Sequence, residues 1–429
     1  MRLALDCAQR SRCPSIAVVG QDSRGGWLAG SSILDFFRRA PWLTRRRLVV
    51  YPKLFLAVYA VSAVVWLMSS KGLVDPAGHA IGADFVDPWS ASWLTLHGAP
   101  AAVYDVARLW SVERSAVADP AVGFAGFHYP PMYLLIILPL ALLPYVWSLL
   151  AWAAATLAAY LGVMWKIDPE RDSLWLAIAF PGAMVNLTNG QNGFLTLALL
   201  GAALLTLKRR PILAGVMFGL MSYKPQYGVL VPIFLLATGR WRAIGSASVT
   251  VALFAALSLA IFGEQTWQAF YPSVSFTRHV VLEQGGSGFE KLQSAFAAAR
   301  LWGFGVATAY SFQAAVSLIA ALAVIWICRR TAKFELHAAA LATGILLATP
   351  YIMDYDLVVL ALPIAWIAIE GRRSGFLSWE KSLLAFAWLI PLFARSLAGR
   401  AMIPIAPLAM LLLLADIARR AQLPAPAPR

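Results

Sequence analysis

Apolar runs of roughly 20 residues, about the length that crosses a hydrocarbon core, recur along this chain. The polar segments between them are too short to form a soluble domain. The pattern predicts an all-α, polytopic integral membrane protein of about 12 transmembrane helices, in a single domain over residues 48–420. Two runs, 211–222 and 225–238, have half this length and flank Lys224. The run at 130–165 has room for two helices, with a break at Pro144.

Composition supports the membrane class. Hydrophobic residues make up 60% of the chain and charged residues 13%, whereas about a quarter of a soluble domain is charged. Residues 1–47 are expected to form a flexible cytoplasmic tail, because their first part lacks the apolar core of a secretory signal. The Pro- and Ala-rich end, residues 421–429, is expected to be disordered.

The net charge of +14 raises the possibility of a nucleic-acid partner, but the distribution of charge argues against it. A nucleic-acid surface would combine basic residues with exposed aromatics on one face. Here the basic residues gather between apolar runs, as cytoplasmic loops do under the positive-inside rule. Segments 71–128 and 263–304 then lie outside. This predicts a plasma membrane (bacterial inner membrane) protein whose site faces the periplasm. The basic clusters include Arg45 to Arg47, Lys208 to Arg210, Arg329 with Arg330, and Arg372 with Arg373.

The first outer segment carries a carboxylate, Asp84, and two amphipathic stretches, at 88–98 and 103–117. Trp89, Trp93 and Leu96 share one helical face, and tryptophan-rich amphipathic helices lie in the membrane interface. The segment is either an anchored surface loop or a platform that receives a lipid-borne substrate beside Asp84. The second outer segment, 263–304, contains a glycine-rich stretch at 285–288 and is expected to be flexible enough to close over a substrate.

Several short motifs follow one another between residues 82 and 356. They are Asp84-Phe85 with Trp89, Tyr129-Pro130-Pro131, Asn189-Gly190-Gln191-Asn192, Tyr223-Lys224-Pro225-Gln226, and Pro350-Tyr351 with Tyr355-Asp356. This ordered set resembles glycosyltransferase family 87, a group of membrane enzymes with the GT-C fold, and the resemblance implies a GT-C-type helical bundle. It also implies a hexosyltransferase that uses a polyprenyl-phosphate sugar, as the polyprenol-phosphate-mannose-dependent mannosyltransferases of the family do, and a lipid or glycan acceptor.

The implied reaction needs a base for the acceptor hydroxyl and a cation for the departing phosphate. We expect Asp84 to be the base, with Asp87 as the competing candidate; a helix cap is the structural alternative for Asp84. Lys224 is the first choice for binding the phosphate. Placing an ionisable side chain between apolar half-helices costs free energy unless the side chain is paired or faces water, so such a residue is a functional candidate. Snorkelling to the interface is its alternative. Other candidates for binding donor phosphate or sugar are Gln226, Arg278, His279, Lys291, His128, Tyr129, Gln191, Asn192, Tyr351, Asp354 and Asp356.

Asp354-Tyr355-Asp356 spells the D-x-D pattern that holds a metal in nucleotide-sugar transferases. A lipid monophosphate donor does not require one, so a polar cap is the favoured interpretation. No cofactor is expected, with a divalent metal ion left open. The rival function is a transporter or flippase of lipid-linked sugars. Transporters often contain paired repeats with broken helices, and no second copy of the Asp-Phe or Pro-Pro motif is present.

Overall fold

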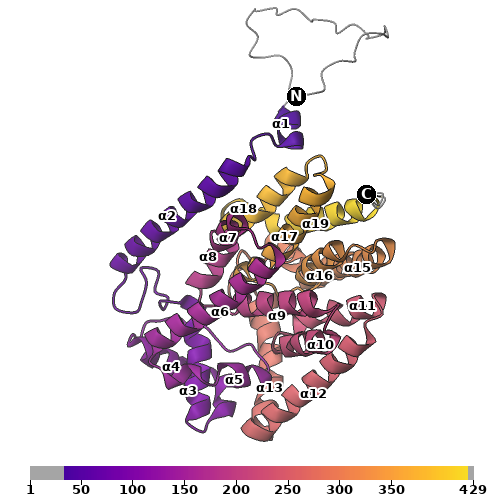
Figure 1. Cartoon of the computed structure of the whole chain (residues 1–429). Coiled ribbons are helices and arrows are strands. Elements are labelled where there is room, and N and C mark those ends of the chain that lie inside the picture. Colours follow the sequence, from indigo (N-terminus) through magenta and orange to yellow (C-terminus); the bar gives the residue numbers. More distant parts are fainter. Residues whose placement is uncertain (1–32, 424–429) are drawn as a thin grey trace, which may run out of the picture.

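The computed structural model describes residues 33–423, which form helices joined by short turns and a few isolated β-bridges (Figure 1). The prediction of an all-α chain is confirmed over these residues. Most of the predicted N-terminal tail and of the C-terminal tail lies outside them. The helices are α1 (Ile33–Arg39), α2 (Arg45–Ser69), α3 (Val86–Leu96), α4 (Val106–Val117), α5 (Met132–Ile137), α6 (Tyr145–Ile167), α7 (Arg171–Ile178), α8 (Pro181–Thr188), α9 (Gly193–Thr206), α10 (Pro211–Leu220), α11 (Leu230–Ala237), α12 (Trp241–Phe262), α13 (Glu264–Phe276), α14 (Ala295–Leu301), α15 (Val306–Arg330), α16 (Phe334–Leu347), α17 (Ala361–Ser374), α18 (Glu380–Ala401) and α19 (Ile405–Ala421).

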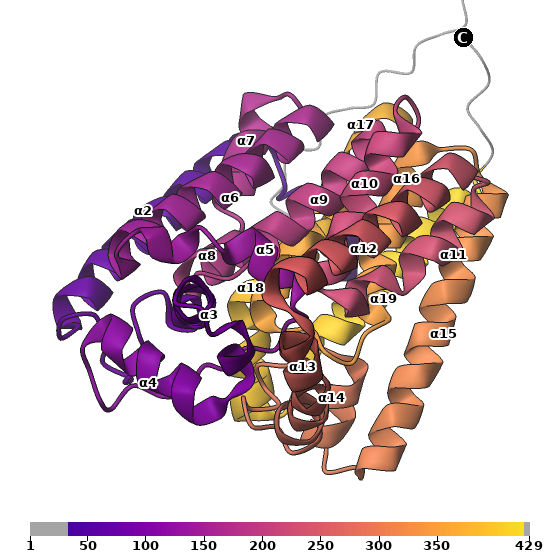
Figure 2. The same ribbon diagram turned by 90° about the horizontal axis from the view of Figure 1, so that it is seen from below.

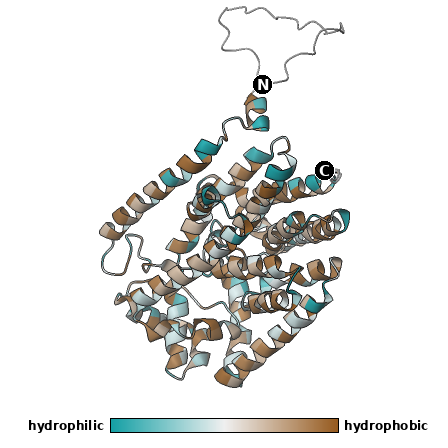
Figure 3. Ribbon diagram, in the orientation of Figure 1, coloured by the Kyte–Doolittle hydropathy of each residue, from teal (hydrophilic) through white to brown (hydrophobic). Residues whose placement is uncertain are grey.

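Within the described residues, five helices are long and apolar enough to cross a membrane, by length and composition: α2, α6, α12, α15 and α18. Helices α2 and α12 leave most of their apolar side chains uncovered, such as Val61 and Leu253, and hydrophobic residues run along both (Figure 3). A helix that is apolar all round needs an apolar environment, so this is a membrane protein. The number of about 12 crossings stays a prediction, because other apolar helices, such as α9 and α16, are shorter.

The segment from 130 to 167 makes one full-length helix rather than two. Pro144 does mark the break, but α5 before it has only 6 residues, too few to cross. Helix α6 then leads to a short loop before α7, and Asp168 of this loop pairs with Arg372 (2.6 Å) while Asp172 in the first turn of α7 pairs with Arg45 (3.0 Å). This loop therefore lies at the end of the molecule that carries basic clusters. We call this the basic end.

The predicted pair of half-length helices is confirmed. Helices α10 and α11 flank two short 3-10 turns, with Lys224 between them. Helix α10 packs closely on α12 because Gly215 and Gly219 have no side chains. A Cβ on Gly219 would lie 2.6 Å from the Cβ of Thr250, and one on Gly215 would overlap Ser246. Small residues let membrane helices approach in this way. The contact holds α10 against α12, and thereby positions Lys224, which follows the end of α10.

The two outer segments are more helical than loops usually are. Helices α3 and α4 confirm the two amphipathic stretches. The segment 263–304 forms α13, a π-helix (Thr277–Glu283) and α14 over most of its length, and its closure over a substrate stays a prediction. Helix α13 packs on the 3-10 turn Pro100–Tyr104 between α3 and α4, on the side of the molecule seen in Figure 2. Residues 284–294, with Gly285 and Gly288 at positive φ, form the longest stretch of the segment between helices.

Part of the predicted N-terminal tail is also ordered. Residues 33–47 contain α1 and the start of α2. The carbonyl of Phe37 accepts a hydrogen bond from the Ser382 hydroxyl (2.6 Å), and that of Arg38 accepts one from the backbone N–H of Trp379 (2.8 Å). These bonds attach α1 to the start of α18.

Candidate active site

One polar cavity brings together residues from six separate parts of the chain. Two of its carboxylates, Asp84 and Asp87, come from the first outer segment, and the third is Asp356; its lysines come from positions more than 100 residues after Asp87. Ten of the side chains proposed from the sequence line it. The lining residues are Asp84, Asp87, Ala125, Gly126, His128, Tyr129, Gln191, Lys224, Gln226, Ser287, Lys291, Tyr351, Met353, Tyr355 and Asp356.

Asp84 lies on a short 3-10 turn (Ala83–Phe85) and is held by two partners. Both of its oxygens accept hydrogen bonds from Lys291 Nζ, at 3.2 and 3.0 Å, and Oδ2 accepts one from Gln191 Nε2 at 3.1 Å. Gly190 has φ +60°, and this backbone turn brings the side chain of Gln191 to Asp84. A Cβ at Gly190 would lie 2.5 Å from the Cβ of Phe85, so only glycine lets the turn at 189–192 pack on the Asp84 turn.

Asp87, in the first turn of α3, differs from Asp84 in its burial and in its hydrogen bonding. Its side chain is buried, and its Oδ1 has no hydrogen-bond partner within residues 33–423. Burial raises the pKa of Asp87 well above its ordinary value, and the neighbouring Glu113 and Asp84 raise it further. The cavity therefore holds one carboxylate paired with lysine and one desolvated carboxylate facing the same space.

The two cavity lysines are both paired with carboxylates. Lys224 Nζ lies 2.8 Å from Asp356 Oδ1, and each side chain is only 3% exposed. The snorkelling alternative for Lys224 is therefore wrong, since the side chain is buried beside a partner. Lys291 is 14% exposed and Asp84 24%. The ring of Tyr355 lies under both ammonium groups, 5.5 Å from Lys224 Nζ and 5.7 Å from Lys291 Nζ.

A short backbone pairing explains why Lys291 faces the cavity. Leu292 and Met353 form an antiparallel β-bridge. Beside it, the Asp354 N–H donates to the Lys291 carbonyl (3.0 Å), and the Gln293 N–H donates to that of Ile352 (2.8 Å). This joins the glycine-rich stretch to the segment that carries Asp356.

Hydrogen bonds behind the cavity hold its aromatic wall. The Tyr129 hydroxyl donates to Gln191 Oε1 (3.2 Å) and accepts from Asn192 Nδ2 (2.9 Å), which also reaches the Tyr133 hydroxyl (3.0 Å). Asn192 thus positions Tyr129 without lining the cavity. His128 Nδ1 lies 2.9 Å from Thr277 Oγ1. Burial lowers the pKa of His128 to about 4, so its ring is neutral at pH 7 and offers hydrogen bonds rather than charge.

Three of the proposed residues lie away from the cavity. Arg278 and His279 are more than 60% exposed on the π-helix, where both approach Glu283. Asp354 faces Arg395 (3.5 Å) while Asp356 faces Lys224. The two carboxylates of the D-x-D pattern thus interact with different cations, Arg395 of α18 and Lys224 between α10 and α11.

Three residues of this region were not among the candidates proposed from the sequence: Glu113, Ser287 and Tyr355, the last of which was quoted only as part of a motif. Tyr355 stands between two candidate aspartates, and Ser287 stands within the glycine-rich stretch, so both had a local signal. Glu113 had none, because it is spaced like any polar residue on α4. Its buried carboxylate accepts the backbone N–H groups of Ala125 (3.2 Å) and Gly126 (3.3 Å), which form one wall of the cavity.

Comparison with known proteins matches residues 127–350, just over half of the chain, to the model of glycosyltransferase family 87. The matched range includes Gln191, Lys224 and Lys291, while Asp84 and Asp87 precede it. Neither curated proteins nor solved structures give a match. The polar cavity described above thus lies in a membrane enzyme of the hexosyltransferase kind, and the chain belongs to glycosyltransferase family 87.

Proposed function

We propose that this protein transfers a hexose, mannose by its resemblance to the family, from a polyprenyl-phosphate sugar to a lipid or glycan acceptor. The reaction takes place on the outer face of the plasma (bacterial inner) membrane. The observation that carries the proposal is the shared cavity, in which Asp84 and Asp87 face Lys291 and Lys224. This is the pairing of base and cation that transfer from a phosphate leaving group requires.

The chemistry follows from the charges of the donor. Its phosphate joins lipid and sugar as a diester, and it gains a second negative charge when the bond to the anomeric carbon breaks. The acceptor oxygen forms the new bond to that carbon, and its proton passes to a carboxylate. The electron pair of the broken bond stays on the phosphate, where a lysine ammonium stabilises it.

Asp84 is the proposed base, and Lys291 joins Lys224 as a proposed phosphate ligand. Lys291 is the more exposed lysine and contacts Asp84 directly. A donor phosphate that attracts Lys291 would leave Asp84 free to accept a proton. In this arrangement, donor binding prepares the base for the acceptor. Asp87 remains the alternative base, supported by its unpartnered oxygen.

The test uses the full-length protein in lipid nanodiscs, with tritiated farnesyl-phosphate mannose as donor and a lipid extract from a deletion strain as acceptor. The proposal expects labelled mannose in a new, larger product, and none when Asp84 and Asp87 are both replaced by asparagine. Absence of any transferred label would overturn it. Passage of intact donor across a proteoliposome membrane, without transfer, would instead assign the transporter function.

A further inference from the structure

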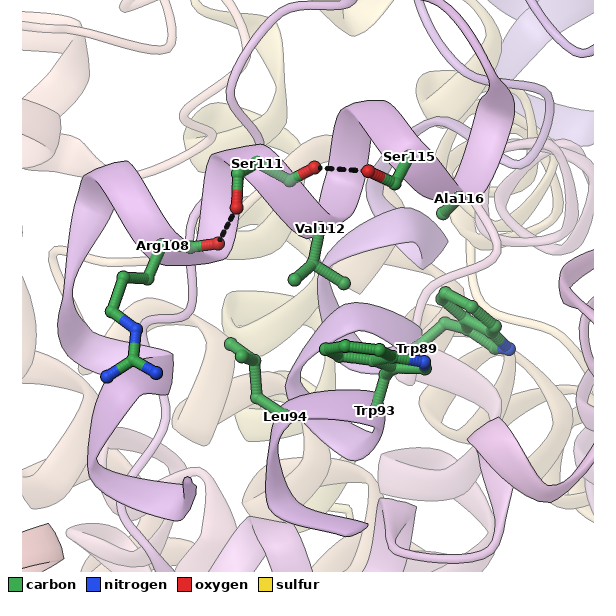
Figure 4. A pocket seen from close by; sticks show the side chains of 8 residues that line it. All are labelled: Trp89, Trp93, Leu94, Arg108, Ser111, Val112, Ser115 and Ala116. Carbon is green, nitrogen blue, oxygen red and sulfur yellow. Dashed lines mark hydrogen bonds between the residues drawn. The ribbon is translucent and has the colours of Figure 1, made fainter. Parts of the chain in front are cut away.

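A second hollow, separate from the cavity, lies between α3 and α4 and has a volume of about 440 Å³ (Figure 4). This volume is in the usual range of small-molecule sites. The α3 side is formed by Trp89, Trp93 and Leu94, and the α4 side carries Ser111, Val112 and Ser115, with Arg108 at one end. We call it the α3–α4 groove. It shares no lining residue with the cavity.

The polar groups of the groove are available to a ligand. The Ser111 hydroxyl donates to the carbonyl of Arg108 (2.7 Å) and the Ser115 hydroxyl to that of Ser111 (2.8 Å), so both oxygens keep lone pairs to accept further bonds. The guanidinium of Arg108 is exposed and has no partner in the described part of the chain. It therefore adds an uncompensated positive charge to the groove.

The rings of Trp89 and Trp93 line the groove. The N–H of Trp89 donates to the carbonyl of Leu143 (3.1 Å), and one face of Trp93 is covered by His97, with ring centroids 3.9 Å apart, which leaves its other face for a ligand. A sugar ring has an apolar C–H face that packs on an indole, and hydroxyls at its edge that bond to serine and arginine. Arginine also pairs with phosphate in a bidentate way. The combination fits a phosphorylated saccharide better than an acyl chain, which would leave the arginine and serines unpaired.

The groove also has a defined direction relative to the cavity. Asp87 and Trp89 lie at the start of α3, while Leu94 lies near Arg108. At 1.5 Å per residue, Asp87 and Leu94 are about 10 Å apart along the helix axis. A saccharide in the groove would thus carry its phosphate at the Arg108 end and its far sugar toward the carboxylates.

We propose that the α3–α4 groove binds the phosphosaccharide head of a lipid-linked acceptor. This inference rests on the proposed function and chooses one acceptor class within it. Trp89 and Trp93 carry the sugar faces, and Arg108 binds the acceptor phosphate. Donor and acceptor phosphates then have separate cations, Arg108 in the groove and the lysines in the cavity.

The experiment measures binding of a tritiated farnesyl-pyrophosphoryl disaccharide to the full-length protein in nanodiscs of neutral lipid. Excess farnesyl phosphate occupies the donor cavity and supports no transfer, so turnover does not affect the result. We expect Arg108→Ala to weaken binding about tenfold, in line with loss of a charge-assisted pair. Arg114→Ala is the matched control: it lies on the same helix, but over the Trp110 ring (4.4 Å) rather than in the groove.

A neutral octyl disaccharide has no phosphate, so it separates the contribution of the tryptophans to sugar binding from that of Arg108 to phosphate binding. Trp93→Ala should weaken its binding, whereas Arg108→Ala should leave it unchanged. The inference would be overturned if Arg108→Ala and Arg114→Ala bound the pyrophosphoryl probe with equal affinity. It would also be overturned if the wild-type protein did not bind the probe once farnesyl phosphate is present. Displacement of the probe by phosphatidylglycerol in the nanodisc would overturn it as well, because it would show a membrane lipid in the groove. Because no step requires turnover, these outcomes are independent of the transfer assay.

Discussion

Lys291 Nζ lies 3.0 Å from Asp84 Oδ2, although the two residues are 207 positions apart. The contact connects the glycine-rich stretch after the π-helix to the first outer segment. It also places a cation directly beside the proposed base. Lys224 has a different partner, Asp356, and is more deeply buried than Lys291, so substitutions at the two lysines should have different effects.

Replacing Lys291 with methionine should weaken donor binding about tenfold or more, because the phosphate loses a charge-assisted partner. Folding should be nearly unaffected, since Lys291 and Asp84 are both partly exposed and water can solvate the remaining carboxylate. Binding of tritiated farnesyl-phosphate mannose and thermal unfolding measure the two effects. Lys381→Met, at the start of α18, serves as a control. Unchanged donor affinity would remove Lys291 from the phosphate site.

Lys224→Met should destabilise the protein, because it leaves the buried Asp356 without its cation. Breaking a buried ion pair from one side costs about 3–5 kcal/mol. The double variant Lys224→Met with Asp356→Asn should recover much of the lost unfolding temperature, yet still bind donor weakly. If the double variant is as unstable as the single one, the Lys224–Asp356 pair does not explain the effect. If the double variant binds donor normally, Lys224 is purely structural.

Asp84→Asn keeps the shape of the side chain but removes its basicity. Transfer should fall by about 10²–10⁴-fold, the usual effect of losing a general base. Donor binding should survive, because a negative charge near the phosphate is removed. Asp87→Asn should reduce transfer less. Rates come from the nanodisc assay with labelled donor and lipid extract. The reverse order of the two variants would make Asp87, with its unpartnered oxygen, the base.

Glu113 gives a pH-dependent prediction. Burial raises its pKa from 4.5 to about 7, even though its bonds to Ala125 and Gly126 lower it. The folded protein therefore binds more protons at this group than the unfolded chain between pH 4.5 and 7, and stability falls as pH rises through that window. Glu113→Gln removes this contribution. The drop in unfolding temperature between pH 4.5 and pH 8 should be smaller in the variant than in wild type.

The exposed Glu264 on α13 provides the control for Glu113. Glu264→Gln should leave the pH dependence of unfolding as in wild type, because this variant keeps the buried Glu113 and changes only an exposed position. An identical drop in wild type and Glu113→Gln would show that Glu113 does not titrate in this window.

Topology can be tested with single cysteines at positions 119 and 372 in a background without native cysteines. Position 119 follows α4 in the first outer segment, and Arg372 belongs to the basic end. We expect a membrane-impermeant maleimide to label intact cells at 119 only, and at 372 only after permeabilisation. Labelling of both positions from one side would contradict an outward-facing cavity.

Features that depend on residues close together in the chain could be predicted from the amino-acid sequence. Hydropathy over one helix length identified a membrane protein. The half-length runs around Lys224 predicted the break between α10 and α11, and the spacing of Trp89 and Trp93 predicted α3. Each of these depends on periodicity within a window of about 20 residues. The same signal overestimated the segment before Pro144, because apolar character alone does not distinguish a crossing helix from the short helix α5.

Which polar residues come into contact depends instead on how distant segments pack in the folded chain. Lys291 and Arg278 both follow α13 and look equivalent in sequence, yet a backbone pairing with residues 352–354 turns one into the cavity while the π-helix exposes the other. Glu113 is spaced like a surface residue but is buried behind the cavity wall. Such contacts depend on elements that lie far apart along the chain and pack together only in the fold. No local pattern encodes them, because burial of a polar side chain is a property of its neighbours rather than of its own segment.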